Sequence, residues 1–196
     1  DPHVLSVLIF TSGTSASSKA VMLSHKNICA DIMALGGVVN FKPGDSVVSI
    51  LPLSHTFENT TGLLFPLFLG ITICISDGLK YFSGNLTEYK PACLIGVPLI
   101  FDKFKERIMA EVKKKGMEKK VRVSMSIANF LSRLGINLKR KLFKQLLEPF
   151  GGDLQVIVTG GAGMEVDTVK FYENIGVRVY QGYGLTETSP VVAGGN

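Results

Sequence analysis

The sequence predicts an α/β domain with mostly parallel sheets flanked by helices. Short apolar runs alternate with longer segments in which apolar residues recur every three or four positions, and strands that alternate with helices in this way form parallel sheets. The 196 residues correspond to roughly one large domain, at about 150 residues per domain. Hydrophobic residues make up 46% of the chain and charged residues 19%. This composition excludes a disordered chain, which buries too little apolar surface to offset its conformational entropy.

Six apolar runs bounded by turn residues predict the strands. They cover residues 4–10, 46–51, 71–75, 92–97, 154–159 and 177–181. The first run, VLSVLIF, is continuously apolar, which predicts a strand buried on both faces. The second run follows a turn made by Pro43, Gly44 and Asp45, and Pro98 closes the fourth.

Helices are predicted between these strands. They are expected over about 25–38, with Ser24 as the N-cap, over 60–69, and over 165–175, where Gly176 ends the helix. Between residues 99 and 150 the apolar period is that of helices. Three apolar stripes follow one another there: Phe101, Phe104, Ile108 and Val112; Ile127, Phe130, Leu131, Leu134 and Leu138; and Leu142, Phe143, Leu146 and Leu147.

The sequence does not predict a membrane span or a secreted protein. The most apolar stretch, residues 63–75, contains Pro66 and is shorter than the about 20 residues of a spanning helix. The first residues lack the basic and apolar regions of a signal peptide. The three cysteines stand singly without C-x-x-C spacing, which predicts reduced thiols in a cytoplasmic protein.

Positive charge is concentrated in one basic helical segment, residues 101–150. This segment holds 14 Lys and Arg against 5 Asp and Glu, whereas the remainder of the chain is mildly acidic. A solvated helix face and a surface for peripheral attachment to an anionic membrane both fit this pattern. Nucleic acid is not an expected partner, since no aromatic residues interleave with the charges.

A loop rich in small residues and hydroxyls, TSGTSASSK over residues 11–19, follows the first strand. Its backbone N–H groups and hydroxyls could converge on an anion, and Lys19 adds a positive charge for phosphate oxygens. The loop differs from the phosphate loop of NTPases, because Ser18 and Ala20 flank the lysine where that motif has Gly and a hydroxyl residue. An ordinary Ser/Gly turn would have the same composition.

Two motifs carry a family resemblance. Residues 10–21, FTSGTSASSKAV, resemble the T-S-G-T-T-G-x-P-K-G-V signature of the adenylate-forming superfamily, which includes acyl-CoA synthetases. Residues 181–188, QGYGLTET, resemble its Y-G-x-T-E signature in the long-chain acyl-CoA synthetase form. Three further segments resemble family motifs in the same order: residues 51–58, 96–103 and 159–163. The first signature departs from the family pattern at three positions, Ala16, Ser18 and Ala20.

The resemblance implies roles for individual residues. The implied phosphate-binding residues of the first loop are Thr11, Ser12, Gly13, Thr14, Ser15 and Lys19. The implied adenine site comprises Tyr183, which would stack on the base, with Gly160, Gly161, Ala162, Gln181, Gly182 and Gly184 around it. Thr186 would contact the α-phosphate and Glu187 would bind Mg²⁺, so that the implied catalytic residues are Lys19, Thr186 and Glu187. His55 and Phe57 would border the acyl substrate.

The resemblance also implies an activity. The expected enzyme uses ATP and Mg²⁺ to convert a carboxylic acid, in particular a fatty acid, to an acyl-adenylate, and CoA thiol then displaces AMP. Two alternatives stay open: an acyl-carrier protein as the acceptor, and a nucleotide-binding module that no longer adenylates. Residues 1–196 are expected to be part of the large N-terminal domain, without the C-terminal domain that carries the catalytic lysine, and therefore to be inactive alone.

Overall fold

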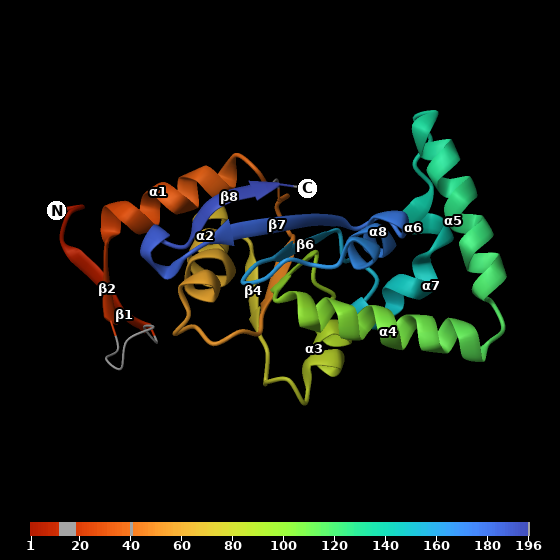
Figure 1. Cartoon of the computed structure of the whole chain (residues 1–196), viewed down its shortest axis with the longest axis horizontal. Helices are drawn as coiled ribbons and strands as arrows, with labels where there is room; N and C mark the ends of the chain where they lie inside the picture. The colour runs from red at the N-terminus through yellow and green to blue at the C-terminus, as the bar shows by residue number, and fades with distance from the viewer. Residues whose placement is uncertain (12–18, 40, 196) are drawn as a thin grey trace.

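The computed structural model describes residues 1–11, 19–39 and 41–195. The strands form a two-stranded hairpin and a six-stranded sheet. Figure 1 shows the hairpin at one end of the long axis, the larger sheet in the middle and a group of helices at the other end. The hairpin pairs β1 (Leu5–Thr11) with β2 (Lys19–Ser24) in antiparallel register. Residues 12–18, which include the predicted phosphate-binding residues Ser12, Gly13, Thr14 and Ser15, lie outside the described part of the chain.

The central sheet confirms the predicted parallel topology. Its strands are β3 (Ser46–Ser49), β4 (Thr72–Ile75), β5 (Cys93–Gly96), β6 (Val156–Thr159), β7 (Arg178–Gly184) and β8 (Val191–Gly195). They are arranged in the order β4-β3-β5-β6-β7-β8. Every pair is parallel except β7 with β8, which is antiparallel. The sequence did not predict β8.

Helices cover both faces of this sheet. The longer segments are α1 (His25–Gly36), the π-helix η1 (Glu58–Leu64), α2 (Phe65–Leu69), α3 (Phe82–Tyr89), α4 (Pro98–Lys114), α5 (Glu118–Arg133) and α8 (Val166–Asn174). Short turns complete the chain: α6 (Lys139–Leu142), α7 (Lys144–Leu147), and the 3₁₀ turns η2 (Glu148–Phe150) and η3 (Thr186–Thr188). As predicted, Ser24 caps α1, with its Oγ accepting the Asn27 N–H at 3.2 Å.

Successive residues of the central strands belong to two hydrophobic cores. Val48 and Leu94 pack with α3, α4 and α8 on one face, whereas Val47 and Cys93 pack with α1 and α2 on the other. Strands buried on both faces read as continuous apolar runs, which is why the sequence revealed them.

The prediction that the first strand is buried on both faces was wrong. Leu8 is 47% exposed and Phe10 is 67% exposed. The strand pairs only with β2, and this hairpin packs its other side, with Val7 and Ile9, against the α1 core. In the described part of the chain, one face of this two-stranded antiparallel ribbon packs against the core and the other face is exposed.

The second predicted apolar stripe lies mostly on the helix α5, but its residues are not in the core. Ile127, Phe130 and Leu134 are more than half exposed, and α5 instead buries Val121 and Ala128. The first stripe is on α4, as its helical period predicted, and all four of its residues are buried. The third divides, because Phe143 and Leu147 are buried while Leu142 is exposed and Leu146 is half-buried. A stripe predicts a helix, but the face that packs depends on the neighbouring helices.

The predicted helix over 60–69 begins earlier and has two parts. Its first part is the π-helix η1, which begins at Glu58, and only α2 is α-helical. Helix α3 was not predicted, because its sequence FSGNLTEY has few apolar residues. None of the described helices is long and apolar enough to cross a membrane.

Replacing Tyr172 with Phe should destabilise the fold. Tyr172 is fully buried, and its hydroxyl donates to the Phe101 carbonyl at 2.8 Å, which joins α8 to α4. Tyr172→Phe removes this donor, and we expect the free energy of unfolding in urea to fall by about 1 kcal/mol. Tyr81→Phe is the matched control, because Tyr81 is 55% exposed; equal effects of the two changes would contradict the assignment.

Candidate functional site

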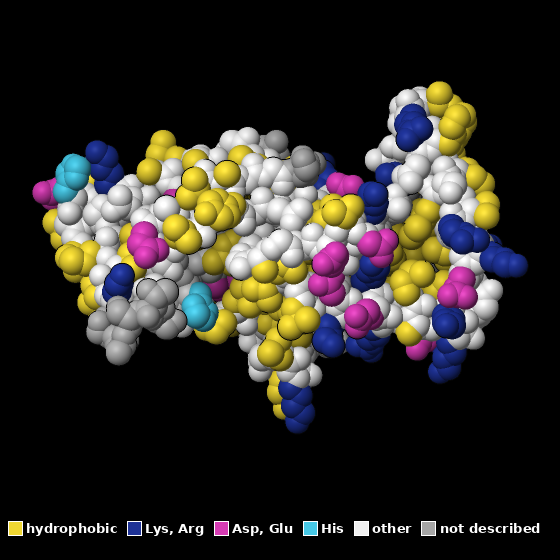
Figure 2. Space-filling model, viewed as in Figure 1, with side chains coloured by type: hydrophobic (Ala, Val, Ile, Leu, Met, Phe, Trp, Pro, Cys, Tyr) yellow, Lys and Arg dark blue, Asp and Glu magenta, His cyan; other side chains and the backbone are white. Residues whose placement is uncertain are grey.

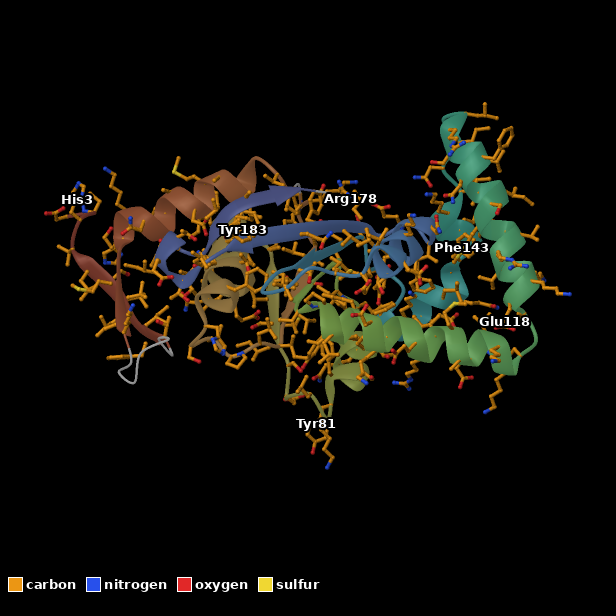
Figure 3. The ribbon with its side chains drawn as sticks, in the orientation of Figure 1. His3, Tyr81, Glu118, Phe143, Arg178 and Tyr183 are labelled. Carbon is orange, nitrogen blue, oxygen red and sulfur yellow. The ribbon has the colours of Figure 1, made fainter. Side chains whose placement is uncertain are left out.

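The loops that follow the parallel strands meet in one cavity. It has a volume of about 380 Å³ and lies at the carboxyl ends of β3, β5, β6 and β7. Ligands bind at this edge in open α/β sheets. The lining residues are Leu51, Pro52, His55, Thr56, Phe57, Val97, Gly160, Gly161, Gly182, Tyr183, Gly184, Leu185, Thr186, Pro190 and Val191. Figure 3 labels Tyr183 on β7, well separated from Glu118 at the helical end of the molecule.

The wall formed by the loop after β6 requires glycine. A Cβ at Gly160 would lie 3.0 Å from Phe57 Cε2 and 3.4 Å from the Gly182 carbonyl oxygen. Gly161 has a φ of +83°, in the left-handed region that glycine adopts readily. The backbone therefore presents a flat surface to the cavity, with Tyr183 from the neighbouring strand also in its lining.

Gln181 has a supporting position rather than a place in the cavity lining. Its side-chain Oε1 accepts the backbone N–H of Met164 at 3.0 Å, which ties the loop after β6 to β7. Ala162 is exposed in this loop and is also absent from the lining. Of the predicted adenine-site residues, the structure thus brings together the four glycines and Tyr183.

A tight turn follows β7 and carries the predicted catalytic pair. Gly184 has no room for a side chain, since a Cβ would lie 1.7 Å from the Pro190 carbonyl oxygen. Within the turn, the Thr188 hydroxyl accepts the Leu185 N–H at 3.0 Å and donates to the Pro190 carbonyl at 2.6 Å. Thr186 lines the cavity, whereas Glu187 lines a neighbouring hollow of about 800 Å³ beside α1.

Of the first predicted phosphate-binding segment, the structure describes Thr11 and Lys19, and neither is among the residues that line the cavity. Thr11 and Lys19 are paired at the end of the hairpin where residues 12–18 connect the two strands, and Lys19 is exposed. Strand β2 packs against η3, so the hairpin stands beside the turn that carries Thr186 and Glu187. At the far end of β2 from Lys19, Ser24 lines the same hollow as Glu187 and Thr188, and Lys19 itself is not among the residues that line the cavity.

Two buried carboxyl groups near the cavity were missed by the sequence analysis. Glu58 is fully buried at the start of η1, and burial raises its pKa to about 7, although the Ser49 hydroxyl that donates to it at 2.5 Å favours the ionised form. Asp31 of α1 is 7% exposed, and burial raises its pKa to about 6 despite the Val191 N–H donor at 3.4 Å. For Asp31 the available signal was an acidic residue within an otherwise apolar segment, whereas Glu58 has mostly polar neighbours in the sequence and gave no such signal.

The described side chains could hold Mg²⁺ only together with the phosphates of a bound nucleotide. Across residues 1–11, 19–39 and 41–195, no group of three or more His, Cys, Asp or Glu side chains could enclose a metal ion. Mg²⁺ commonly binds one or two carboxylates together with substrate phosphates and water. The exposed carboxylate of Glu187 fits that single-ligand arrangement.

Comparisons with known proteins find a family model and relatives that match this chain. Residues 1–196 match the family model for AMP-binding enzymes. The Long-chain-fatty-acid--CoA ligase 3 of Saccharomyces cerevisiae is 29% identical over 96% of this chain and 28% of its own length. The chloroplastic Long-chain-fatty-acid--[acyl-carrier-protein] ligase AEE15 of Arabidopsis thaliana is 26% identical over 98% of this chain and 32% of its own length.

A solved structure shares the fold. A malonyl-CoA ligase with methylmalonyl-CoA and AMP bound superposes with a TM-score of 0.72 at 20% identity, covering 99% of this chain and 35% of that chain. This chain spans about a third of the length of the relatives it matches.

Asp31 and Glu58 should make stability depend on pH. Their native pKa values of about 6 and about 7 lie above the ordinary values of 3.8 and 4.5. Between about pH 4 and 7 the native state therefore binds more protons than the unfolded state. The contribution of these two groups to the free energy of unfolding therefore falls as the pH rises through this range. We expect the stability difference between wild type and Glu58→Gln to change by up to about 1.4 kcal/mol per pH unit in this window.

Urea denaturation at several pH values measures this difference. Glu106→Gln is the control, because Glu106 is exposed on α4. The same pH dependence in wild type and Glu58→Gln would contradict titration of the buried carboxyl.

Proposed function

Because this chain belongs to the AMP-binding enzyme family, we propose that the protein containing it activates a carboxylic acid by adenylation and transfers the acyl group to a thiol. The observation that carries this proposal is the cavity at the ends of β6 and β7, where glycine backbone and Tyr183 line the same space beside Thr186. An aromatic face and a flat backbone wall suit a purine base.

The phosphates would extend from this base towards the turn η3. The Thr186 hydroxyl would donate to the α-phosphate, where negative charge accumulates during attack by the acid. Mg²⁺, held by Glu187 and the phosphates, supplies charge neutralisation. Lys19 and Thr11, which pair where residues 12–18 connect the hairpin strands, would bind the departing pyrophosphate. The packing of β2 against η3 supports this role, because it brings the hairpin beside the turn that carries Thr186 and Glu187.

The acid would enter along the wall made by His55 and Phe57. His55 is exposed in the cavity lining and could hold the carboxylate, while the half-buried Phe57 ring adds apolar surface. No protein nucleophile is needed, because the carboxylate oxygen attacks the α-phosphorus and pyrophosphate leaves. The site would act by orienting the two substrates and stabilising charge.

We propose a fatty acid as the substrate and CoA as the acceptor. The name of the yeast relative supports both, whereas the name of the Arabidopsis relative supports an acyl-carrier protein as the alternative acceptor. Residues 1–196 by themselves are proposed to be inactive. The alternative function outside the enzymes is a nucleotide-binding module that does not catalyse adenylation.

Pyrophosphate exchange tests the adenylation half-reaction without an acceptor. In the complete protein, we expect ATP–pyrophosphate exchange that depends on an added fatty acid and peaks at one chain length. Thr186→Ala should lower kcat about 10²-fold, by loss of one donor to the transition state. The control Thr72→Ala changes an exposed threonine on edge strand β4.

Two results of this assay would contradict the proposal. If no acid supported pyrophosphate exchange while the protein still bound Mg-ATP, the result would favour a nucleotide-binding module that does not adenylate. Unchanged exchange in Thr186→Ala would exclude this hydroxyl from the reaction.

We further propose a cytoplasmic protein that contacts an anionic membrane through the basic helical segment. Figure 2 shows Lys and Arg side chains gathered at the helical end. A hollow of about 840 Å³ there carries Lys115, Lys120, Lys141 and Lys144, and α5 exposes Ile127 and Phe130 beside it. Arg140 has a structural role instead, since its guanidinium donates to the Gly152 and Leu154 carbonyls.

Vesicle sedimentation tests this contact. Each cation near the headgroups contributes about 1 kcal/mol, so Lys119→Glu, Lys120→Glu and Arg122→Glu together should abolish binding to vesicles that contain phosphatidylserine. Lys26→Glu and Lys42→Glu, at the opposite end of the chain, form the control. Equal sedimentation of the two variants would contradict a membrane contact at this segment.

A further inference from the structure

Glu58 is a buried acidic residue for which the proposed reaction provides no role. Its side chain is fully buried, and its Oε1 accepts the Ser49 hydroxyl at 2.5 Å. Ser49 is the last residue of β3, and Glu58 is the first residue of η1. The backbone N–H groups of Ile50 and Leu51 also favour the ionised carboxylate. The carboxyl therefore closes the segment 50–57, which contains the cavity-lining His55 and Phe57, into a loop.

The π-helix is shaped to accommodate this carboxyl. A Cβ at Gly62, four residues after Glu58, would lie 2.6 Å from Oε1 and 2.7 Å from the carboxyl carbon. A methyl group at this position would thus displace the carboxyl from Ser49. Single-turn π-helical segments occur frequently at functional sites.

Two threonines extend the effect of η1 to both sides of the cavity. The Thr61 hydroxyl donates to the Phe57 carbonyl at 2.5 Å. The Thr60 hydroxyl donates to the Ser189 carbonyl at 3.2 Å, across 129 residues of sequence. The π-helix is consequently bonded to the wall that carries Phe57 and to the turn that follows Glu187.

The Phe57 ring links η1 to the cavity, because it packs against the cavity wall. It lies against Gly160, where even a Cβ would come within 3.0 Å of the ring. We propose that Glu58 is a positioning residue, whose carboxyl fixes η1 to the end of β3 and so holds His55 and Phe57 at the cavity. Its effect on the reaction rests on the proposed function, whereas the structural clamp itself does not.

Four variants of the complete protein separate positioning from general stability. Glu58→Ala removes the clamp, and Glu58→Gln keeps Oε1 as an acceptor for Ser49. Gly62→Ala intrudes on the carboxyl, and Gly84→Ala is its control, since a Cβ at Gly84 of α3 would meet nothing within 4 Å.

Hydrogen exchange by mass spectrometry measures the clamp independently of activity. In Glu58→Ala, amides of residues 51–57 should exchange at least tenfold faster, while those of α4 stay unchanged. Glu58→Gln and Gly84→Ala should resemble wild type. Unchanged protection of residues 51–57 in Glu58→Ala would overturn the clamp, even if the wild type proved inactive and the proposed function had failed.

The kinetics of fatty-acid-dependent pyrophosphate exchange measure the consequence. Glu58→Ala should raise KM for the acid about tenfold and leave KM for ATP within twofold, and Glu58→Gln should restore most of the loss. Gly62→Ala alone should also raise KM for the acid. Combined with Glu58→Ala it should add little, because the carboxyl that the new methyl group would displace is already absent from the Glu58→Ala protein. Equal changes in both KM values, or additive effects of the two changes, would overturn positioning by Glu58.

Discussion

The hydrogen-bonded register of the parallel strands β5, β6 and β7 is the constraint on which the cavity depends. Gly96 of β5 is paired with Thr159 of β6, and Thr159 with Gln181 of β7. The next residues along each strand therefore emerge side by side, although they are far apart in sequence. This edge offers backbone rather than bulky side chains, because Gly160 and Gly182 are neighbours across it and a Cβ at Gly160 would lie 3.4 Å from the Gly182 carbonyl oxygen. A shift of one residue in either pairing would separate the wall from Tyr183.

A second set of interactions holds the loops around this edge. The Thr60 hydroxyl bonds η1 to Ser189, and the Asp31 carboxylate accepts the Val191 N–H from the start of β8. Gln181 anchors the loop after β6 in the same way. These polar contacts join three segments that would otherwise be independent surface loops. We expect their role to be preorganisation, so that the groups proposed to lie near the α-phosphate would need little rearrangement during the proposed reaction.

Much of the fold was predictable because parallel strands are buried on both faces and α4 buries a regular apolar stripe. The exposed face of β1 and the apolar side of α5 were not, since periodicity identifies an amphipathic element but not its packing partner. At the site, the second signature predicted that Gly182, Tyr183 and Gly184 lie together, and all three line the cavity. The supporting roles of Gln181 and Glu58 depend on contacts with Met164 and Ser49, which local sequence patterns do not encode.

A crystal structure of the complete protein with AMP bound tests the central claim most directly. The adenine ring should pack between Tyr183 and the backbone of Gly160 and Gly161, with the phosphate directed towards Thr186. Adenine in the basic hollow between α4 and α5, or at any place away from the carboxyl ends of β6 and β7, would contradict the assignment of this cavity to the nucleotide.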